Sequence, residues 1–407
     1  MTISQGNSAD MTVDLAILGG GLSGGLCALA LAHHAPHLTV AIIEQEHELA
    51  GNHTWCCHAS DLAAGAGESV GDWFRPLVRY RWPQYQVAFP DFQRTIDGDY
   101  LCIPATALKS EMTKAMAGPG RQILLGHQVV RASAHEVTLA SGRRVRAAAV
   151  LDARGARPDK TACGYQKFVG WEIETAEPAP SLGRNPTLMD ACVQQLDGYR
   201  FVYVLPMSST RFLVEDTYFS RDPMITPEVV AGRLRAYLSD RGIRGYTIVR
   251  EERGVLPMPW TAGPEMAGED STPLALGYRA GLFHPATGYS LGIGAQTAER
   301  LAIALRDALP GTLHDTAVRT IRDVRHGLAV NLRFARTLNF LAFRTIPEKW
   351  LRALVFEAVY RMPQEILGRF YAARNTTRDR LALLAAVARV PWNRPALPVT
   401  QLHGETP

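Results

Sequence analysis

Residues 13–44 read VDLAILGGGLSGGLCALALAHHAPHLTVAIIE. A short apolar run ends in three glycines, an Ala/Leu-rich segment from Leu26 to Ala35 follows, and a second apolar run comes next, from Thr39 to Ile43. Strand, glycine turn, helix and strand in this order are typical of a βαβ unit with parallel strands. The sequence therefore predicts an α/β fold that begins with a Rossmann-like domain.

Three glycines of this stretch, Gly19, Gly21 and Gly24, match G-x-G-x-x-G. The first permits a tight turn, the second lets a pyrophosphate approach the backbone, and the third lets the helix pack closely on the strand. The free N–H groups at the helix start, at Leu22 and Ser23, would hold the phosphate charge. We therefore expect these residues to bind an adenine dinucleotide.

The acid at the end of the second strand is Glu44, which follows Gly24 by 20 residues. A carboxylate there can accept hydrogen bonds from both ribose hydroxyls and would repel a 2′-phosphate. The sequence therefore favours FAD or NAD over NADP at this site.

Two later segments favour FAD. The first, VLDARG (150–155), is a strand that runs into a small-residue turn containing Arg154. The second, GLFHPATGYS (281–290), is a Pro/Gly loop before a helix whose N–H groups could hold a flavin oxygen. Its candidate cofactor contacts are His284, Pro285, Thr287, Gly288, Tyr289 and Ser290.

The order of these patterns predicts a flavoprotein of the glutathione-reductase and hydroxylase plan. We expect a discontinuous FAD-binding domain at 11–164 and 272–318, and a strand-rich substrate domain at 165–271. A basic helical region would cover 319–407.

Composition excludes several other classes. The chain has 407 residues, 47% hydrophobic and 20% charged, which rules out collagen-like, coiled-coil and disordered proteins. Its six cysteines form no C-x-x-C pair, which argues against a zinc site and a secreted disulfide scaffold. With neither a signal peptide nor a run of about 18 apolar residues, we expect no transmembrane helix.

The segment from Arg319 to Arg394 is basic, with 15 Lys and Arg against 5 Asp and Glu, whereas the rest holds 28 against 34. Nucleic-acid binding would suit this charge. The apolar residues among the arginines favour amphipathic helices on an anionic lipid surface instead. A helical cap packed on the FAD-binding domain, with its arginines in solvent, fits the pattern equally well.

Two adjacent acids, Glu215 and Asp216, lie in the second strand of a predicted hairpin, Tyr199–Leu205 and Arg211–Phe219. Successive strand residues point to opposite faces, so only one acid can enter a given cavity. The Glu215 face carries Leu213, Thr217 and Phe219, and the Asp216 face carries Phe212, Val214 and Tyr218. The alternation does not choose between them.

Several segments together resemble the bacterial lycopene β-cyclase family of carotenoid biosynthesis. They are NHTW (52–55), FVYVLP (201–206), FLVEDTY (212–218), GVLP (254–257), GLFHPATGYS (281–290) and RFYAAR (369–374). The glutamate-centred strand and the 281–290 loop are the specific ones. The chain departs from the family at Cys56 and Cys57, where serine and phenylalanine are more usual.

The resemblance implies a redox-neutral isomerisation, in which linear ends of lycopene are protonated and closed to β-rings, giving β-carotene via γ-carotene. It implies that Glu215 is the acid and base, with Asp216 in a supporting role. Such an acid must stay protonated near neutral pH, which a dry apolar pocket achieves. Reduced FAD would stabilise the cation, and NADH or NADPH would serve only to reduce the flavin.

Aromatic faces can stabilise a carbocation without trapping it. The aromatic candidates for lining a hydrocarbon tunnel are Trp171, Tyr203, Trp260 and Phe283, and Glu172 is a second candidate acid. Because lycopene resides in the bilayer, we expect a peripheral enzyme that binds the cytoplasmic side of a membrane. Two alternatives stay open: a flavin monooxygenase or isoprenoid reductase of the same fold, and a non-catalytic flavoprotein in a carotenoid enzyme assembly.

Overall fold

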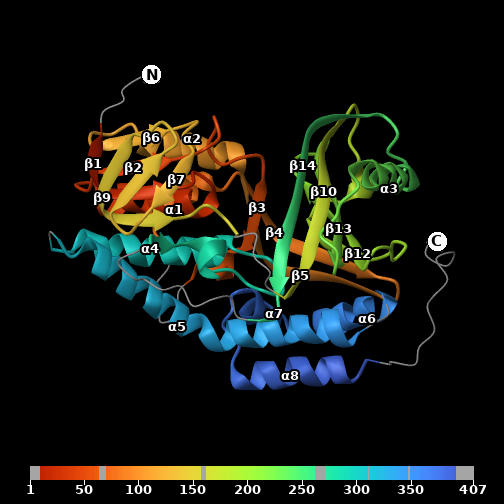
Figure 1. Ribbon diagram of the computed structural model, residues 1–407. Helices are drawn as coiled ribbons and strands as arrows, with labels where there is room; N and C mark the ends of the chain where they lie inside the picture. The colour runs from red at the N-terminus through yellow and green to blue at the C-terminus, as the bar shows by residue number, and fades with distance from the viewer. Residues whose placement is uncertain are drawn as a thin grey trace.

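The computed structural model describes residues 10–63, 70–156, 162–261, 272–309, 311–346 and 349–390, without the side chains of 349–351. Two β-sheets stand side by side, and a layer of helices runs beneath both (Figure 1). The α/β expectation with a strand-rich second part and a helical C-terminal region is confirmed.

The first sheet contains the predicted βαβ unit. Strand β1 (Met11–Leu18) leads through the glycine turn into α1 (Leu22–His34), and β2 (Val40–Ile43) returns parallel to β1. On its other side, β1 pairs in parallel with β9 (Arg144–Asp152). The remaining strands of this sheet are β6 (Arg121–Leu124), β7 (Val129–Ala132), β8 (Glu136–Leu139) and β15 (Leu274–Ala275).

Helices α1, α4 (Leu291–Arg306) and α5 (Leu313–Phe340) pack on one another beneath this sheet. Alanine and leucine side chains of α1 and α4 form a continuous buried core with β1 and β9. A further helix, α2 (Ala105–Ala115), contacts α1 from the other side. The cofactor turn is thereby held between a rigid strand and a buried helix.

The second sheet has the order β14-β10-β13-β12-β11-β4-β5-β3. Its bounds are β3 (Thr54–His58), β4 (Tyr80–Phe89), β5 (Phe92–Pro104), β10 (Cys163–Thr175), β11 (Thr187–Asp190), β12 (Tyr199–Pro206), β13 (Arg211–Ser220) and β14 (Tyr246–Pro259). The structure differs here from the expected domain boundary, because β3, β4 and β5 come from the 11–164 segment. Alternation along a strand predicts its faces but not the sheet that it joins.

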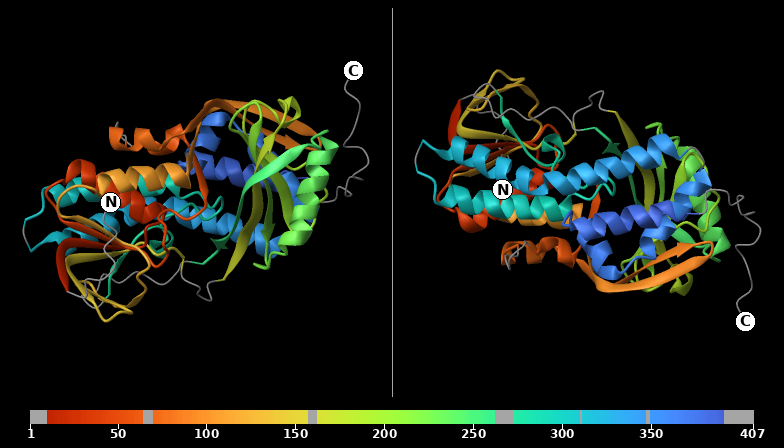
Figure 2. Two further views of the ribbon diagram at one scale, coloured as in Figure 1. Left: turned by 90° about the horizontal axis from the view of Figure 1, so that it is seen from above. Right: turned by 90° about the horizontal axis from the view of Figure 1, so that it is seen from below.

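The two faces of the second sheet are covered differently. Helix α3 (Pro227–Asp240) packs on one face, over a cluster that includes Phe212, Val214 and Tyr218. The opposite face packs on α6 (Lys349–Tyr360), α7 (Gln364–Tyr371) and α8 (Thr377–Ala388). Figure 2 shows these C-terminal helices from below.

The helical character expected after Arg319 is confirmed for the part of the segment that the structure describes, and Arg394 lies outside it. Helix α5 ends in a π-turn, η6 (Leu341–Thr345), before α6 begins. Within the described ranges, every helix is too short or too polar to cross a membrane.

Candidate functional site

The glycine turn after β1 has the geometry that the motif predicts. Gly19 has a φ of +97°, and a Cβ atom there would lie 2.9 Å from the carbonyl oxygen of Ala153. A Cβ at Gly24 would lie only 2.0 Å from the carbonyl oxygen of Gly19, so helix and turn require glycine there. Gly21 instead faces open space, with nothing within 4 Å of its Cβ position. The turn thus leaves room where a pyrophosphate would approach.

Glu44 closes this turn at the end of β2. Its Oε2 accepts a hydrogen bond from the Gly20 N–H (2.7 Å) and its Oε1 one from the Glu46 N–H (3.0 Å). The carboxylate also lines a cavity that begins at the glycine turn, where Leu22 and Ser23 line it too. Glu44 is therefore fixed in place at the cavity, where its carboxylate could accept hydrogen bonds from the ribose of a dinucleotide.

A buried carboxylate orients two arginines at the same cavity. Arg154 donates to Asp152 through Nε (2.9 Å) and Nη2 (2.8 Å), and Arg279 Nε lies 3.3 Å from the same carboxylate. These bonds hold the pKa of Arg154 above its ordinary value. Both arginines line the cavity. The sequence indicated Arg154 but missed Arg279, which lies outside the motifs.

The 281–290 loop divides into two parts. Thr287, Gly288, Tyr289 and Ser290 line the cavity directly before α4. The side chains of His284 and Pro285 are buried on the side of the loop away from the cavity. This position differs from the expected contact with the cofactor. The His284 ring packs edge-on against Phe370 (4.8 Å between ring centroids), and burial lowers its pKa to about 4.

Pro285 serves the same anchoring purpose, because its carbonyl accepts a hydrogen bond from Asn339 Nδ2 (2.7 Å). The two residues thus attach the loop to the C-terminal helices.

The cavity has a volume of about 1080 Å³. It runs from the glycine turn past the loop into a space between the second sheet and the C-terminal helices. Single ligand pockets span roughly 300–1,000 Å³, so this cavity lies at the upper limit of that range. Its far end is lined by apolar side chains that include Leu338, Leu341, Phe343, Val355, Phe356 and Val387.

Glu215 enters this cavity from β13 and is 8% exposed. Thr217 Oγ1 donates to its Oε1 (2.6 Å). Burial, and then the nearby charge of Glu252, raises the pKa of Glu215 to about 8. At neutral pH this carboxyl is therefore mostly protonated, as an acid catalyst requires.

Asp216 points the other way, toward α3, and is fully buried. Arg200 donates to both of its oxygens (2.8 and 3.0 Å), and the Tyr218 hydroxyl donates to Oδ2 (2.7 Å). The expected supporting role of Asp216 in catalysis does not fit its position, because the alternation of the strand points its side chain away from the cavity. It forms a buried ion pair.

Of the four aromatic residues expected to line a tunnel, Tyr203 alone reaches the cavity. Trp171 lies on the α3 face, where its Nε1 donates to Glu251 Oε2 (3.1 Å). Phe283 stacks on Tyr278 (4.1 Å between centroids), and Trp260 packs near Phe343 (6.1 Å). Those three residues belong to the surrounding core.

The aromatic lining comes largely from residues that the sequence did not indicate. The Tyr100 hydroxyl bonds to those of Tyr203 (3.0 Å) and Tyr289 (2.7 Å), so three tyrosines from three elements meet. Tyr360, Phe370 and Tyr371 of the C-terminal helices line the same space. Helical periodicity could mark these as buried, but nothing local shows what they face.

The second candidate acid, Glu172, is held as an ion. Burial alone would raise its pKa, but hydrogen bonds from Arg250 (2.8 Å) and Arg211 (2.6 Å) outweigh it, so its pKa lies below the ordinary value. Glu172 is therefore unsuited to protonating a substrate. The sequence missed Glu252, a buried carboxyl on β14.

All six cysteines, which lie in the described ranges, are free thiols. Cys56 lines the cavity and faces Cys102 across the β3–β5 pair, whereas Cys57 is buried in the neighbouring core. Burial raises the pKa of the Cys57 and Cys102 thiols well above the ordinary value. Neutral thiols of this kind act as small apolar side chains.

Comparisons with known proteins give consistent results. Residues 14–397 match the family model described as lycopene cyclase protein. A lycopene beta-cyclase from a Paracoccus species is 37% identical over 390 residues, which cover 94% of this chain and 95% of the relative.

Solved structures share the fold. A geranylgeranyl bacteriochlorophyll reductase-like protein from Thermoplasma acidophilum superposes with a TM-score of 0.61 and 13% identity, covering 95% of this chain and 98% of that one. A probable FAD-dependent monooxygenase from Pseudomonas aeruginosa gives a TM-score of 0.55 and 15% identity, covering 82% and 97%. At these identities the likeness concerns the flavoprotein fold alone.

Proposed function

The chain belongs to the lycopene cyclase family, and from this premise we propose that it is an FAD-dependent lycopene β-cyclase. It converts linear ends of lycopene to β-rings, giving β-carotene by way of γ-carotene, without net redox. The observation that carries the proposal is Glu215, a buried carboxyl with a raised pKa in an apolar cavity that is continuous with the glycine turn.

The residues present fit FAD. Open space at Gly21 leaves room for a pyrophosphate, and Glu44 and Arg154 line the same cavity, where Glu44 could bind the ribose. The loop residues 287–290 border the space between this turn and Glu215, where the ring system would lie. Reduced FAD, kept so by NADH or NADPH, would supply negative charge near a carbocation.

Glu215 provides the chemistry of the protein itself. Its proton passes to the terminal double bond of lycopene, and the neighbouring double bond attacks the resulting cation and closes the ring. A ring proton then returns to the Glu215 carboxylate, so that the acid is restored. Tyr203, Phe219 and Phe356 border the same space, where aromatic faces stabilise a cation by about 2 kcal/mol each when water is excluded.

The C-terminal helices both close the cavity and expose apolar side chains. Val330 and Phe340 of α5 and Leu381 and Leu384 of α8 are exposed, and Arg380 of α8 bonds to Asn331 of α5 (3.1 Å), which places the two helices together. The exposed arginines of α5, of the η6 turn after it, and of α8 with its C-terminal cap residue are Arg319, Arg322, Arg333, Arg344, Arg378 and Arg389.

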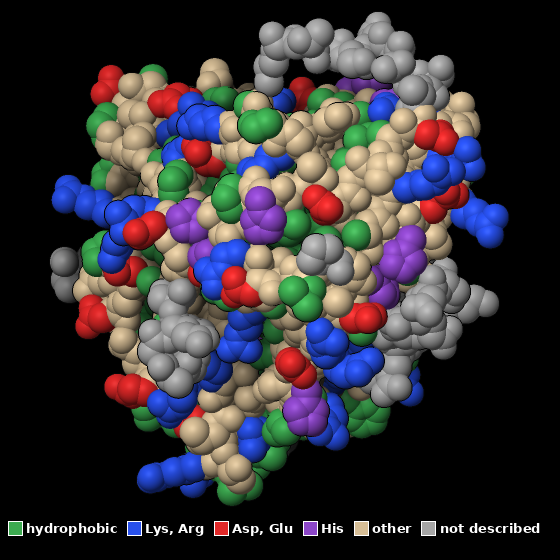
Figure 3. Space-filling model, turned by 90° about the vertical axis from the view of Figure 1, so that its left-hand side faces the viewer, with side chains coloured by type: hydrophobic (Ala, Val, Ile, Leu, Met, Phe, Trp, Pro, Cys, Tyr) green, Lys and Arg blue, Asp and Glu red, His purple; other side chains and the backbone are tan. Residues whose placement is uncertain are grey.

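We take this surface, called here the α5–α8 face, as the contact with the cytoplasmic side of a membrane. The apolar end of the cavity lies directly behind it, at Leu338 and Val387. Lycopene would then pass from the bilayer to Glu215 without crossing water. Acidic and basic side chains are interspersed on the first-sheet side (Figure 3), which suits an anionic lipid surface less.

The test is anaerobic incubation of the purified protein with lycopene in liposomes, reduced FAD and deuterated water, followed by chromatography and mass spectrometry. Proton-initiated cyclisation gives a product with the elemental composition of lycopene and one deuterium per ring. A product changed by oxygen or by two hydrogens would overturn the proposal in favour of a monooxygenase or a reductase.

A further inference from the structure

A second carboxyl stands beside Glu215 across a single glycine. Strand β10 lies between β13 and β14, and its Gly170 is opposite Glu215 on one side and Glu252 on the other. A Cβ atom at Gly170 would lie 3.3 Å from Glu215 Cβ and 3.3 Å from Glu252 Cγ. Both side chains therefore border the same small space on one face of the sheet.

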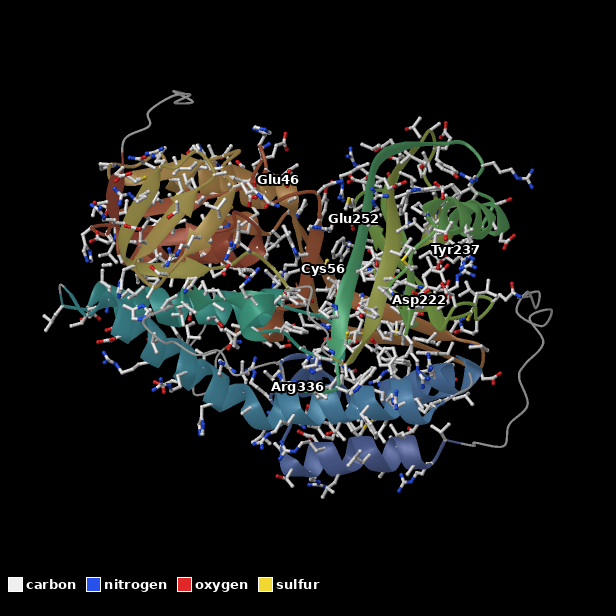
Figure 4. All side chains as sticks on the ribbon, in the orientation of Figure 1. Glu46, Cys56, Asp222, Tyr237, Glu252 and Arg336 are labelled. Atoms are coloured by element: carbon white, nitrogen blue, oxygen red, sulfur yellow. The ribbon has the colours of Figure 1, made fainter. Side chains whose placement is uncertain are left out.

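Burial raises the pKa of Glu252 above its ordinary value, but the charge of Arg250 and the hydrogen bonds from Arg250 and Thr54 act against burial and favour the carboxylate. Glu252 is 4% exposed, and its Oε2 accepts hydrogen bonds from Arg250 Nη1 (2.6 Å) and Thr54 Oγ1 (3.0 Å). Arg250 Nη2 also donates to Thr54 Oγ1 (2.8 Å), which closes the network. Figure 4 shows Glu252 on β14, near Cys56 of the β3 strand that provides Thr54.

Glu215 has a different environment. Its side chain accepts from Thr217, and in the described part of the chain no lysine or arginine is paired with it. Two carboxyls this close do not both ionise readily, and the one beside an arginine ionises first. The negative charge therefore belongs on Glu252 and the proton on Glu215.

We propose that Glu252 is a positioning residue for the cyclisation: its carboxylate, fixed by Arg250 and Thr54, holds the catalytic proton on Glu215 across the gap at Gly170. This inference rests on the proposed function and deepens it. Gly170 is part of the arrangement, because a larger residue in this strand would separate the two side chains.

Other charged and titratable groups also lie near the pair, including Tyr203 of β12, which is opposite Glu215 in the sheet. Arg250 of β14 and Thr54 of β3 contact Glu252, and Glu172 of β10 adds a negative charge near it. The Cys102 thiol of β5 lies close to Glu252, and Asp216 adds a minor effect on Glu215 from the other face. Burial is the largest cause of the raised pKa of Glu215, and the charge of Glu252 is the second.

The test compares Glu252→Gln with Glu251→Gln. The first substitution removes the charge and keeps the shape, while the second removes an exposed charge from the adjacent position, on the opposite face of the same strand. The rate of β-ring formation is measured from pH 5 to 10. In the unchanged protein and in Glu251→Gln, activity falls as pH rises through about 8, because Glu215 loses its proton.

In Glu252→Gln, this fall moves to lower pH by about one unit or more, while the rate at the acid end is retained. A fall at the same pH as in the unchanged protein overturns the inference. Glu252→Asp keeps the charge, so its activity is expected to fall at nearly the same pH as in the unchanged protein. Failure of this rescue also counts against the inference.

An infrared titration of the Glu215 carboxyl, assigned by its absence in Glu215→Gln, makes the test independent of turnover. Its midpoint near pH 8 is expected to move to lower pH in Glu252→Gln and to stay unchanged in Glu251→Gln.

If the protein forms no β-rings but the midpoint still moves, the proposed function fails and the carboxyl pair stands. If β-rings form and the midpoint does not move, the pair fails alone. Should Glu252→Gln lose its fold, Gly170→Ala decides, because its Cβ separates the two side chains: the midpoint is expected to fall there too, and an unchanged midpoint overturns the inference.

Discussion

Glu215 and Asp216 are neighbours in the chain and carry the same functional group, yet their surroundings are opposite. Asp216 meets Arg200 at 2.8 Å and becomes part of the core beneath α3. Glu215 meets an apolar cavity and a second carboxyl, so burial holds its proton. The reactivity of each acid follows from the face on which the pleat places it.

We expect Glu215→Gln and Asp216→Asn to fail in different ways. Glu215→Gln keeps the fold and the flavin but lowers β-ring formation by about 100-fold or more, because the proton donor is gone. Asp216→Asn leaves Arg200 buried without its counter-charge and lowers the free energy of unfolding by about 3 kcal/mol. Urea unfolding and product analysis separate the two effects. Loss of cyclisation in a fully stable Asp216→Asn protein would contradict this assignment.

At the scale of elements, the glycine turn and the curvature of the second sheet position the chemistry. The turn holds α1 against β1 while leaving Gly21 open. The second sheet curls until its two edge strands meet, since Thr54 of β3 bonds to Glu252 of β14. This closure brings the charged network to the side of Glu215.

Alanine substitutions at Gly24 and Gly21 of the turn are expected to have different effects. Gly24→Ala places a Cβ against the Gly19 carbonyl, so it forces α1 away from β1 and lowers the melting temperature even without flavin. Gly21→Ala meets no protein atom, so the apoprotein keeps its melting temperature and FAD affinity falls by about tenfold, or ~1.4 kcal/mol. Flavin titration and thermal unfolding of both apoproteins provide the measurement. Equal stability losses would contradict the assigned geometry.

At the scale of the whole molecule, the cavity belongs to no single domain. Its cofactor end comes from the first sheet, its acid from the second, and its apolar end from helices α5 to α8. The C-terminal region therefore completes the site, and we propose that its outer surface contacts lipid. On this proposal, the two interpretations of the basic segment, a packed cap and a lipid-binding surface, apply to opposite sides of the same helices.

The proposed lipid contact predicts the behaviour of surface variants. Leu381 is 64% exposed on α8, and Leu381→Glu together with Leu384→Glu should reduce co-sedimentation with anionic vesicles and slow turnover of liposomal lycopene. Turnover of detergent-dispersed lycopene should stay unchanged. Val229→Glu is the matched control, because Val229 is 49% exposed on α3, away from this face. Equal losses in the control would refute the role of the α5–α8 face.

The sequence by itself determined the glycine turn, its helix, the acid Glu44 and the opposite faces of Glu215 and Asp216. Each follows from backbone geometry over a few residues, which local spacing records. Only the tertiary structure decided that Tyr203 rather than Trp171 lines the cavity, that His284 anchors its loop, and that the C-terminal helices close the site. It also decided that Glu252 meets Glu215 across Gly170, because sheet order and long-range packing bring those strands together, and no local pattern encodes which strands become neighbours.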